Sequence, residues 1–143
     1  MRARIRVFVD SNVVVSALKS SVGAAYALGE SDVVERIVSN LSEIEILKTV
    51  SRLKLDDKQM EIILKQKFTK VKVENNLPEV VKKFGKYVGD MNDSHVIAGA
   101  VISKASYLVT HNLKHFNTEK IKRELDIIVM SPGTFLQYLR SIS

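Results

Sequence analysis

The apolar residues of this chain gather in short runs that alternate with segments of helical periodicity. Three runs, at residues 5–9, 106–110 and 126–130, are almost continuously apolar, which is typical of strands covered on both faces of a sheet. The run at 34–38 is predicted as a further strand, and 69–74 as a short strand at the edge of the sheet. The pattern therefore predicts a sheet with a buried centre.

Helical patterns occupy most of the chain between these runs. In one of them, residues 42–53, apolar side chains recur at 44, 47, 50 and 53 behind Ser42, which we expect to cap the helix. Small residues at 98–100 would let another helix lie close against the sheet. The predicted helices cover residues 12–20, 42–53, 56–68, 78–88, 93–105 and 131–141. Strands that alternate with helices indicate an α/β fold with a mainly parallel sheet, and no linker or repeat divides residues 1–143, so we expect a single domain.

Composition narrows the classes of protein that fit this pattern. The 143 residues contain no cysteine, which excludes disulfides and thiolate chemistry and fits a cytoplasmic protein. No apolar run approaches the ~18 residues of a membrane span. Asp10 and Asn12 interrupt the first apolar stretch. We therefore expect neither a membrane span nor a signal peptide.

The chain carries an excess of positive charge. Lys and Arg outnumber Asp and Glu by 22 to 16, a net charge of +6, which favours polyanionic partners. Lysines are concentrated in one third of the chain, at positions 65, 67, 70, 72, 82, 83 and 86. They form either solvated helix faces or a surface that binds phosphates.

Polar residues follow the predicted strands at the edge where functional residues of parallel sheets gather. Asp10 comes directly after the first strand, where it either caps the next helix or binds a cation or a substrate. Residues 110–112, Thr-His-Asn, follow a later strand. The helix before that strand begins near Asp90 and Asp93. Asp90 fits the role of the helix cap, and because a helix needs only one such cap, Asp93 is left without a capping role. Brought together at the strand ends, Asp10 and Asp93 would form an all-oxygen site suited to Mg²⁺ or Mn²⁺.

A third acid is available from the helix at 42–53. Glu43 and Glu45 lie in its first turns, where most glutamates complement the helix dipole at the surface. Glu45 lies beside the apolar stripe and can point inward at the strand ends. The phase of the helix alone does not exclude Glu43, so both remain candidates.

Two histidines occur in "THNLKHF", residues 110–116. The spacing of His111 and His115 would suit zinc on a helix, but no cysteine or further suitably placed histidine supports zinc. Contact with substrate phosphates is the preferred interpretation, with Lys114 and His115 as the substrate-binding residues. His95 is expected to be a structural residue of its helix.

Taken in order, these segments resemble the PIN-domain family (PilT N-terminal-like), and within it the VapC-type toxin-like ribonucleases. The resemblance covers nearly the whole chain and rests on "VFVDSNVVVSAL", "SEIEILKTVSRL" and "DMNDSHVIAGAVISKASYLVTHNLKHF". The Asp–Thr/Ser–Asn of the family matches Asp10, Ser11 and Asn12. Its helix glutamate matches Glu45 best, with Glu43 as the fallback. The aspartate that opens the helix before the penultimate strand matches Asp93, and the family's Thr–x–Asp/Asn–x–x–x–Phe turn matches Thr110, Asn112 and Phe116.

This resemblance implies a three-layer α/β/α fold and metal-dependent cleavage of RNA. It implies that Asp10, Glu45 and Asp93 are catalytic and that, with Asn112, they bind Mg²⁺ or Mn²⁺. Asn112 stands where the family commonly has a fourth acid, as in one branch of the family, and it brings no charge. Residues that would orient the carboxylates or a water molecule are Ser11, Asn12 and Thr110.

Several partners follow from the same resemblance. RNA is the expected substrate, and the protein would be the toxin of a toxin–antitoxin pair, with an antitoxin protein as its partner. Dimers are common in the family, and pairing two copies could bring the lysines of one subunit to the acidic site of the other, so we expect a homodimer. The alternative is a PIN-like module that binds RNA or a protein in RNA processing with little or no catalysis, an alternative that Asn112 favours.

Overall fold

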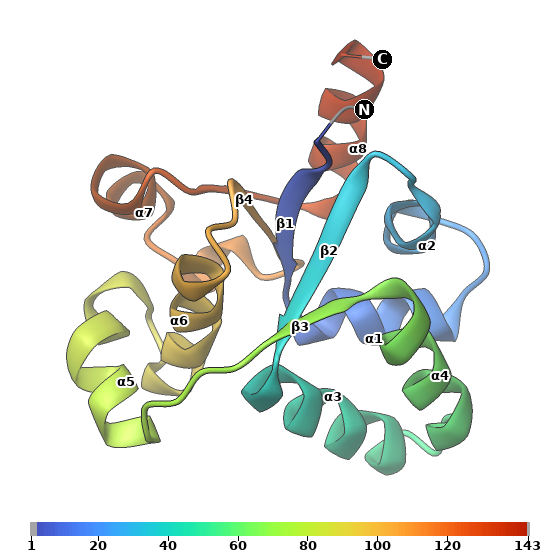
Figure 1. The fold of residues 1–143 in the computed structure, drawn as a ribbon, viewed down its shortest axis with the longest axis horizontal. Helices are drawn as coiled ribbons and strands as arrows, with labels where there is room; N and C mark the ends of the chain where they lie inside the picture. The colour runs from blue at the N-terminus through green and yellow to red at the C-terminus, as the bar shows by residue number, and fades with distance from the viewer. Residues whose placement is uncertain (1–2, 143) are drawn as a thin grey trace.

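A computed structural model describes residues 3–142 of the chain (Figure 1). Its centre is a five-stranded sheet in the order β3-β2-β1-β4-β5, and every pairing in it is parallel. The strands are β1 (Ile5–Val9), β2 (Val34–Ser39), β3 (Thr69–Val71), β4 (Tyr107–Val109) and β5 (Ile128–Met130). The predicted strands are confirmed, and the segment 69–74 supplies a short edge strand.

Eight α-helices surround the sheet in the described part of the chain. They are α1 (Ser11–Lys19), α2 (Ala24–Glu30), α3 (Asn40–Arg52), α4 (Asp57–Lys67), α5 (Leu77–Phe84), α6 (Ser94–Ile102), α7 (Thr118–Leu125) and α8 (Pro132–Ile142). Short 3₁₀ turns are η1 (Gly85–Tyr87), η2 (Met91–Asp93) and η3 (Leu113–His115). Within residues 3–142, no helix is both long enough and apolar enough to cross a membrane.

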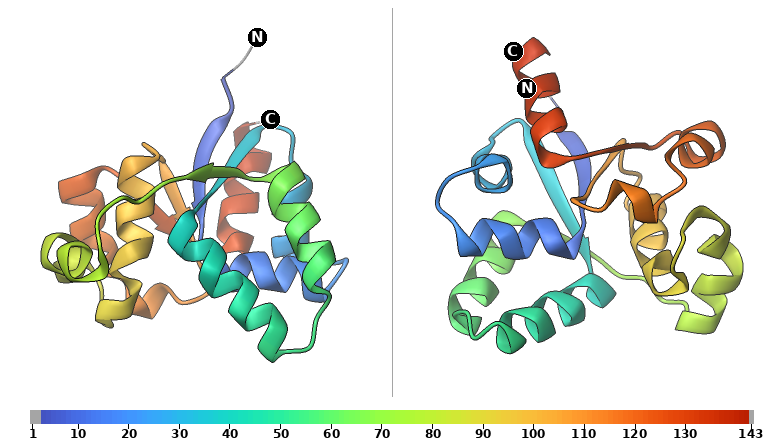
Figure 2. Two further views of the ribbon diagram at one scale, coloured as in Figure 1. Left: turned by 60° about the horizontal axis from the view of Figure 1, so that its bottom comes forward. Right: turned by 180° about the vertical axis from the view of Figure 1, so that it is seen from behind.

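The helices form two layers, one on each face of the sheet, as Figures 1 and 2 show. Phe8, Ile37 and Leu108 point to one face and pack with side chains of α5, α6 and α7. Val9 and Val38 point to the other face and pack with α1, α2, α3, α4 and α8. All five of these strand residues are essentially inaccessible to solvent. The predicted three-layer α/β/α architecture is therefore confirmed.

The order in which the chain adds strands to the sheet reverses at β1. The chain proceeds outward from β1 through β2 to β3, and then crosses to β4 on the other side of β1. The carboxyl ends of β1 and β4 consequently lie side by side, and the backbone N–H of Asp10 donates to the carbonyl of Val109 at 3.0 Å. Such a reversal leaves a crevice beyond the strand ends, which is where ligands of open α/β sheets bind.

Helix α3 differs in phase from its predicted pattern. Ser39, rather than Ser42, is the cap, because its hydroxyl accepts from the Ser42 N–H at 3.0 Å and the helix begins at Asn40. The buried row contains Ile46 and Val50, whereas Ile44 is 53% exposed. The earlier start lets Ser42 and Ile46 face α1 and the sheet, so the predicted stripe at 44, 47, 50 and 53 is wrong except at 50 and, in part, at 47.

Helix α6 lies very close to the sheet, as its small residues predict. A Cβ atom placed on Gly99 would come within 2.4 Å of Cε2 and 2.5 Å of Cζ of Phe8. Because α6 starts at Ser94, directly after Asp93, this close contact also fixes the distance of Asp93 from the end of β1.

Two short helices, α2 and α7, are not predicted from the sequence pattern. α2 follows Gly23, which has a φ of 99°, and it has no side-chain cap at its start. α7 is rich in charge, and Ile121 is its one buried residue. Neither segment shows the long apolar periodicity on which a helix prediction depends.

Candidate metal centre and its pocket

A pocket of about 270 Å³ opens at the carboxyl ends of β1 and β4. The start of α1, one side of α3, the turn before α6 and the turn after β4 form its walls. The residues that line it are Asp10, Ser11, Asn12, Val15, Glu45, Thr49, Arg52, Asp90, Asp93, Asn112 and His115. The fold thus brings the three predicted acids and Asn112 to one pocket, from four segments that are far apart in the sequence.

Asp10 lines this pocket and is 6% exposed. Its carboxylate accepts from the Ser11 N–H at 2.9 Å, which caps α1, and from the Thr110 hydroxyl at 2.8 Å. The side-chain amide of Asn12 also donates to it, at 3.3 Å. Burial raises the pKa of the Asp10 carboxyl, the hydrogen bond from Thr110 opposes this shift, and the charge of Glu45 adds to it. Capping explains one oxygen of Asp10, but it does not balance its charge.

Glu45 is the helix glutamate that reaches the pocket. Its carboxylate accepts from the Ser11 hydroxyl and lies 3.4 Å from Nε2 of His95. Hydrogen bonding to His95 lowers the pKa of Glu45, against the opposing effect of burial. Glu43 instead forms an ion pair with Lys70 on the edge strand, outside the pocket. Of the two candidates, Glu45 is therefore the one at the site.

Asp90 and Asp93 have different roles: Asp90 is a cap, and Asp93 is not. Asp90 caps η2 by accepting from the Asn92 N–H at 3.0 Å. The Asp93 side chain makes no capping hydrogen bond, and its Oδ2 lies 3.5 Å from Nδ1 of His115. Burial raises the pKa of Asp93, the neighbouring His115 opposes the shift, and the charge of Asp90 adds to it. The carboxylate of Asp93 is thus directed to the pocket.

The turn after β4 is held by its polar side chains. The Thr110 hydroxyl, which donates to Asp10, also accepts from the Asn112 N–H at 3.0 Å. Asn12 accepts from the His111 N–H at 3.2 Å, and the His111 ring lies 3.1 Å from the Ser16 hydroxyl. Thr110 therefore couples Asp10 to Asn112. Lys114 follows in η3 and does not line the pocket, although its neighbour His115 does.

His95 lies behind Glu45 and is 6% exposed. Its Nε2 faces Glu45, and its Nδ1 is a buried atom without a hydrogen-bond partner among residues 3–142. The prediction that His95 is a structural residue fits its burial. The sequence did not indicate its contact with Glu45.

The donor set of the pocket fits a hard divalent cation. Three carboxylates and the Asn112 amide offer only oxygen ligands, the type that Mg²⁺ and Mn²⁺ prefer. The raised pKa values of Asp10 and Asp93 indicate burial and negative charge that a cation would relieve. Across residues 3–142, no three Asp, Glu or His side chains already converge closely enough to hold one ion. The Glu45 carboxylate reaches the pocket while it contacts Ser11 and His95.

The lysines concentrated in the middle of the sequence are distributed over several elements. Lys67 at the end of α4 pairs with Glu30, and Lys70 on β3 pairs with Glu43. Lys83 and Lys86 lie instead near α5 and η1, over the rings of Phe84 and Tyr87. Figure 1 places α4 and α5 on opposite sides of the fold. These lysines therefore do not gather at the acidic pocket.

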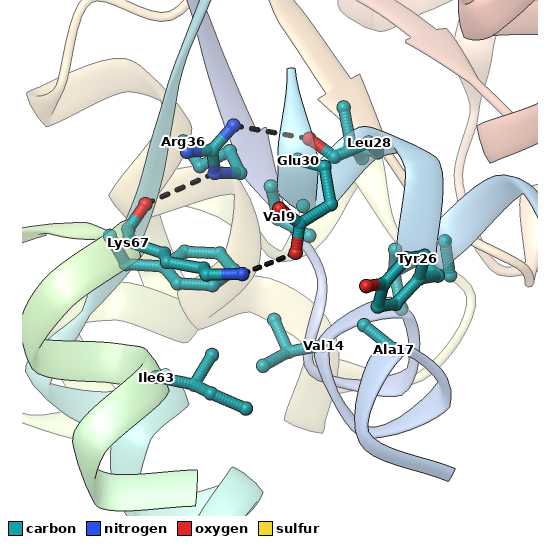
Figure 3. Close-up of a pocket in the computed structure, with 13 residues that line it drawn as sticks. Val9, Val14, Ala17, Tyr26, Leu28, Glu30, Arg36, Ile63 and Lys67 are labelled. Carbon is teal, nitrogen blue, oxygen red and sulfur yellow. Dashed lines mark hydrogen bonds and ion pairs between the residues drawn. The ribbon is translucent and has the colours of Figure 1, made fainter. Parts of the chain in front are cut away.

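A second cavity, of about 50 Å³, lies between α1, α2 and α4 (Figure 3). Its walls are largely apolar, with Val14 and Ile63 among them, and the Glu30–Lys67 ion pair lies at its edge. Arg36 donates there to the carbonyl oxygens of Lys67 and Leu28 at 3.0 and 3.1 Å. This cavity contains none of the predicted site residues and offers little room for a ligand.

Two polar residues of the pocket were missed from the sequence. Thr49 and Arg52 lie four and seven residues after Glu45 on α3, a spacing that places all three on one helix face. That spacing is a signal that could have identified them once Glu45 was chosen. The Thr49 hydroxyl donates to the carbonyl of Glu45 at 2.9 Å.

Comparison with known proteins agrees with this fold. The family model of the PIN domain matches residues 6–114, more than half of the chain, and the chain therefore belongs to the PIN domain family. No curated protein matches it.

Several solved toxin–antitoxin structures share the fold. VapBC2 from Rickettsia felis, bound to a DNA fragment from their promoter, is 17% identical, with 87% of this chain and 97% of that chain covered and a TM-score of 0.59. A toxin–antitoxin complex from Klebsiella pneumoniae is 15% identical, with 88% and 97% covered and a TM-score of 0.63. VapC20 from Mycobacterium tuberculosis, a toxin that cleaves the sarcin–ricin loop, is 18% identical, with 71% and 86% covered and a TM-score of 0.56. At these identities the similarity establishes the fold alone.

Proposed function

We propose that this protein is a metal-dependent endoribonuclease that hydrolyses RNA phosphodiester bonds in the pocket around Asp10, Glu45 and Asp93. The observation that carries the proposal is that these three carboxylates come from separate segments and line one pocket, at the point where the strand order of the sheet reverses. A capping role accounts for part of Asp10 but not for Glu45 or Asp93. Membership of the PIN domain family supports the same activity.

The chain's own residues would divide the work of catalysis. Asp10, Glu45 and Asp93 would hold Mg²⁺ or Mn²⁺, and Asn112 would add a neutral oxygen. Such an ion would lower the pKa of a bound water molecule and would neutralise the charge that develops on the phosphate oxygens. Ser11 and Thr110 would hold the carboxylates of Glu45 and Asp10 in position.

We further propose that the protein acts as the toxin of a toxin–antitoxin pair in the cytoplasm. The supporting observation is the shared fold with solved toxin–antitoxin complexes from Rickettsia felis and Klebsiella pneumoniae. An antitoxin protein would then be its natural inhibitor. Co-expression tests this: a gene product encoded next to this chain should suppress its cleavage of RNA and co-purify with it.

A matched set of variants tests the nuclease. With Mn²⁺ and single-stranded RNA, Asp93→Asn and Glu45→Gln should each reduce cleavage by at least about a hundredfold, because each removes one ligand charge. Glu43→Gln is the control, since it changes the same helix by the same chemistry outside the pocket. If Asp93→Asn cuts RNA as fast as wild type, or if Glu43→Gln loses as much activity as Glu45→Gln, the site assignment is wrong.

The competing function is a PIN module that binds RNA or a protein with little or no catalysis. The specific observation that favours it is Asn112, an uncharged amide where a fourth acid is common in the family. A Mn²⁺ titration separates the two functions. A nuclease gains cleavage as Mn²⁺ saturates the site, whereas a binding module retains RNA without cutting it at any Mn²⁺ concentration.

A further inference from the structure

The face of α3 that lines the pocket changes its charge along the helix. Glu45 lies near the strand ends, Thr49 follows one turn later, and Arg52 is in the last turn. At a rise of 1.5 Å per residue, Arg52 lies about 10 Å further along the helix axis than Glu45. The pocket therefore has a carboxylate end and a guanidinium end.

The Arg52 guanidinium is not used by the fold. No ion pair or hydrogen bond of its side chain occurs among residues 3–142, although the acids Asp10, Glu45, Asp90 and Asp93 line the same pocket. Arg36 offers a contrast, because its guanidinium donates hydrogen bonds to backbone carbonyl oxygens, as Figure 3 shows. Arg36 is thus structural, whereas Arg52 remains available for a ligand.

The chemistry of the pocket indicates what this ligand is. Four carboxylates repel an RNA backbone, and the proposed metal ion would neutralise only the phosphate that is cleaved. A neighbouring phosphate that enters the pocket therefore requires a cation of its own. An arginine fork binds two phosphate oxygens at once, which suits a phosphodiester better than a lysine does. The position of Arg52, about 10 Å along α3 from the acid end, separates it from the phosphate that is cleaved there.

From this geometry we propose that Arg52 binds the phosphate that flanks the scissile phosphate, and so makes the pocket selective for a polynucleotide chain over an isolated phosphodiester. The inference rests on the proposed nuclease function. Arg52 is a specificity-determining residue in this role. The acids act on one phosphate, and Arg52 fixes the register of the chain by holding the next.

Two substrates test the inference. Single-stranded RNA has flanking phosphates, whereas bis(4-nitrophenyl) phosphate has only the phosphodiester that is cleaved. Arg52→Ala should raise KM for RNA about tenfold with little change in kcat. The same variant should cut bis(4-nitrophenyl) phosphate at the wild-type rate. Arg52→Lys should recover part of the RNA affinity, because it keeps the charge and loses the fork.

Two further measurements separate phosphate binding from a structural role. In the Asp93→Asn background, where cleavage is too slow to interfere with a binding measurement, Arg52→Ala should reduce the slope of log K against log salt concentration by about 0.7, the value for one phosphate contact on a single strand. Calorimetry without RNA should find Mn²⁺ binding to Arg52→Ala as tight as in wild type. Lys19→Ala is the control, since it removes one charge from the far end of α1, outside the pocket.

The outcomes are distinct. Equal losses on RNA and bis(4-nitrophenyl) phosphate, or weaker Mn²⁺ binding, would show that Arg52 supports the metal site and would overturn the inference. RNA affinity equal to that of Lys19→Ala would overturn it as well, while leaving the nuclease intact. A wild-type protein that neither binds nor cuts RNA would refute the proposed function and, with it, the role of Arg52.

Discussion

The contact between α6 and β1 gives a sharp test of how the fold sets the site. Gly99 of α6 faces Phe8, which is wholly buried, and an added Cβ would lie 2.4 Å from the Phe8 ring. Gly99→Ala therefore forces either the ring or the whole helix to move. Because Asp93 directly precedes α6 and Asp10 directly follows β1, any such shift also changes the separation of the two carboxylates.

The magnitude follows from two opposing effects. Inserting a methyl group into a packed core costs about 1–3 kcal/mol, while replacing glycine by alanine inside a helix returns up to about 1 kcal/mol. Because the added Cβ would lie 2.4 Å from a wholly buried ring, the cost is at the upper end of its range, about 2–3 kcal/mol. The net loss is then about 1–2 kcal/mol, which for a chain of this length lowers Tm by about 3–8 °C. Mn²⁺ affinity should fall as well, since the carboxylates are displaced.

Gly29→Ala is the matched control for this substitution. Gly29 lies in α2, and a Cβ placed there would meet nothing within 4 Å. The same chemical change should therefore leave the protein equally stable or raise its stability by up to about 1 kcal/mol. Differential scanning calorimetry of both variants without metal measures the two effects. If Gly99→Ala melts at or above the temperature of Gly29→Ala, the close packing of α6 on Phe8 does not constrain the fold as argued.

Three further predictions concern the site and the assembly. Burial raises the folded-state pKa of Asp10 above its ordinary value of 3.8, so the stability linked to its protonated form is present at low pH and lost as the pH rises through that pKa. Asp10→Asn should therefore abolish cleavage while its Tm, measured without metal, gains on that of wild type as the pH rises above about 4; a difference in Tm that does not change with pH would contradict the argument. Asn112→Asp adds a carboxylate to the pocket and should tighten Mn²⁺ binding about tenfold by calorimetry, and unchanged binding would place Asn112 outside the metal ligands. We expect a homodimer, so light scattering should give twice the chain mass of 16.1 kDa. A monomer that cleaves RNA would show that dimerisation is not needed for activity.

The sequence predicted the sheet, and the place of the acids in one pocket, because both depend on local signals. Strand β1 is an apolar run that ends on Asp10, and parallel strands gather such residues at one edge. The choice between Glu43 and Glu45 was harder, because it depends on where α3 begins. The true cap, Ser39, determines which residues of α3 face inward, and Ser42 was mistaken for this cap in the sequence.

Other features depend on tertiary contacts that leave no local signal. Helix α2 has few residues and no side-chain cap, so its stability comes from packing of Leu28 rather than from its own sequence. The spacing from Glu45 could place Arg52 on the pocket side of α3, but the sequence does not show that its guanidinium is unpaired, because this follows from the ion pairs that other charged side chains make. The clustering of lysines in the sequence was likewise no guide to their clustering in space.

The hydrogen bonds of Arg36 link the ends of α2 and α4, so they affect how these two helices unfold locally. Its guanidinium donates to Leu28 and Ser31 at the end of α2 and to Lys67 at the end of α4, while its backbone belongs to β2. A helix as short as α2 does not persist alone in water. The last turns of α2 and α4 should therefore become solvent-accessible together, as one cooperative unit in amide hydrogen exchange, and Arg36 is the residue that makes them one.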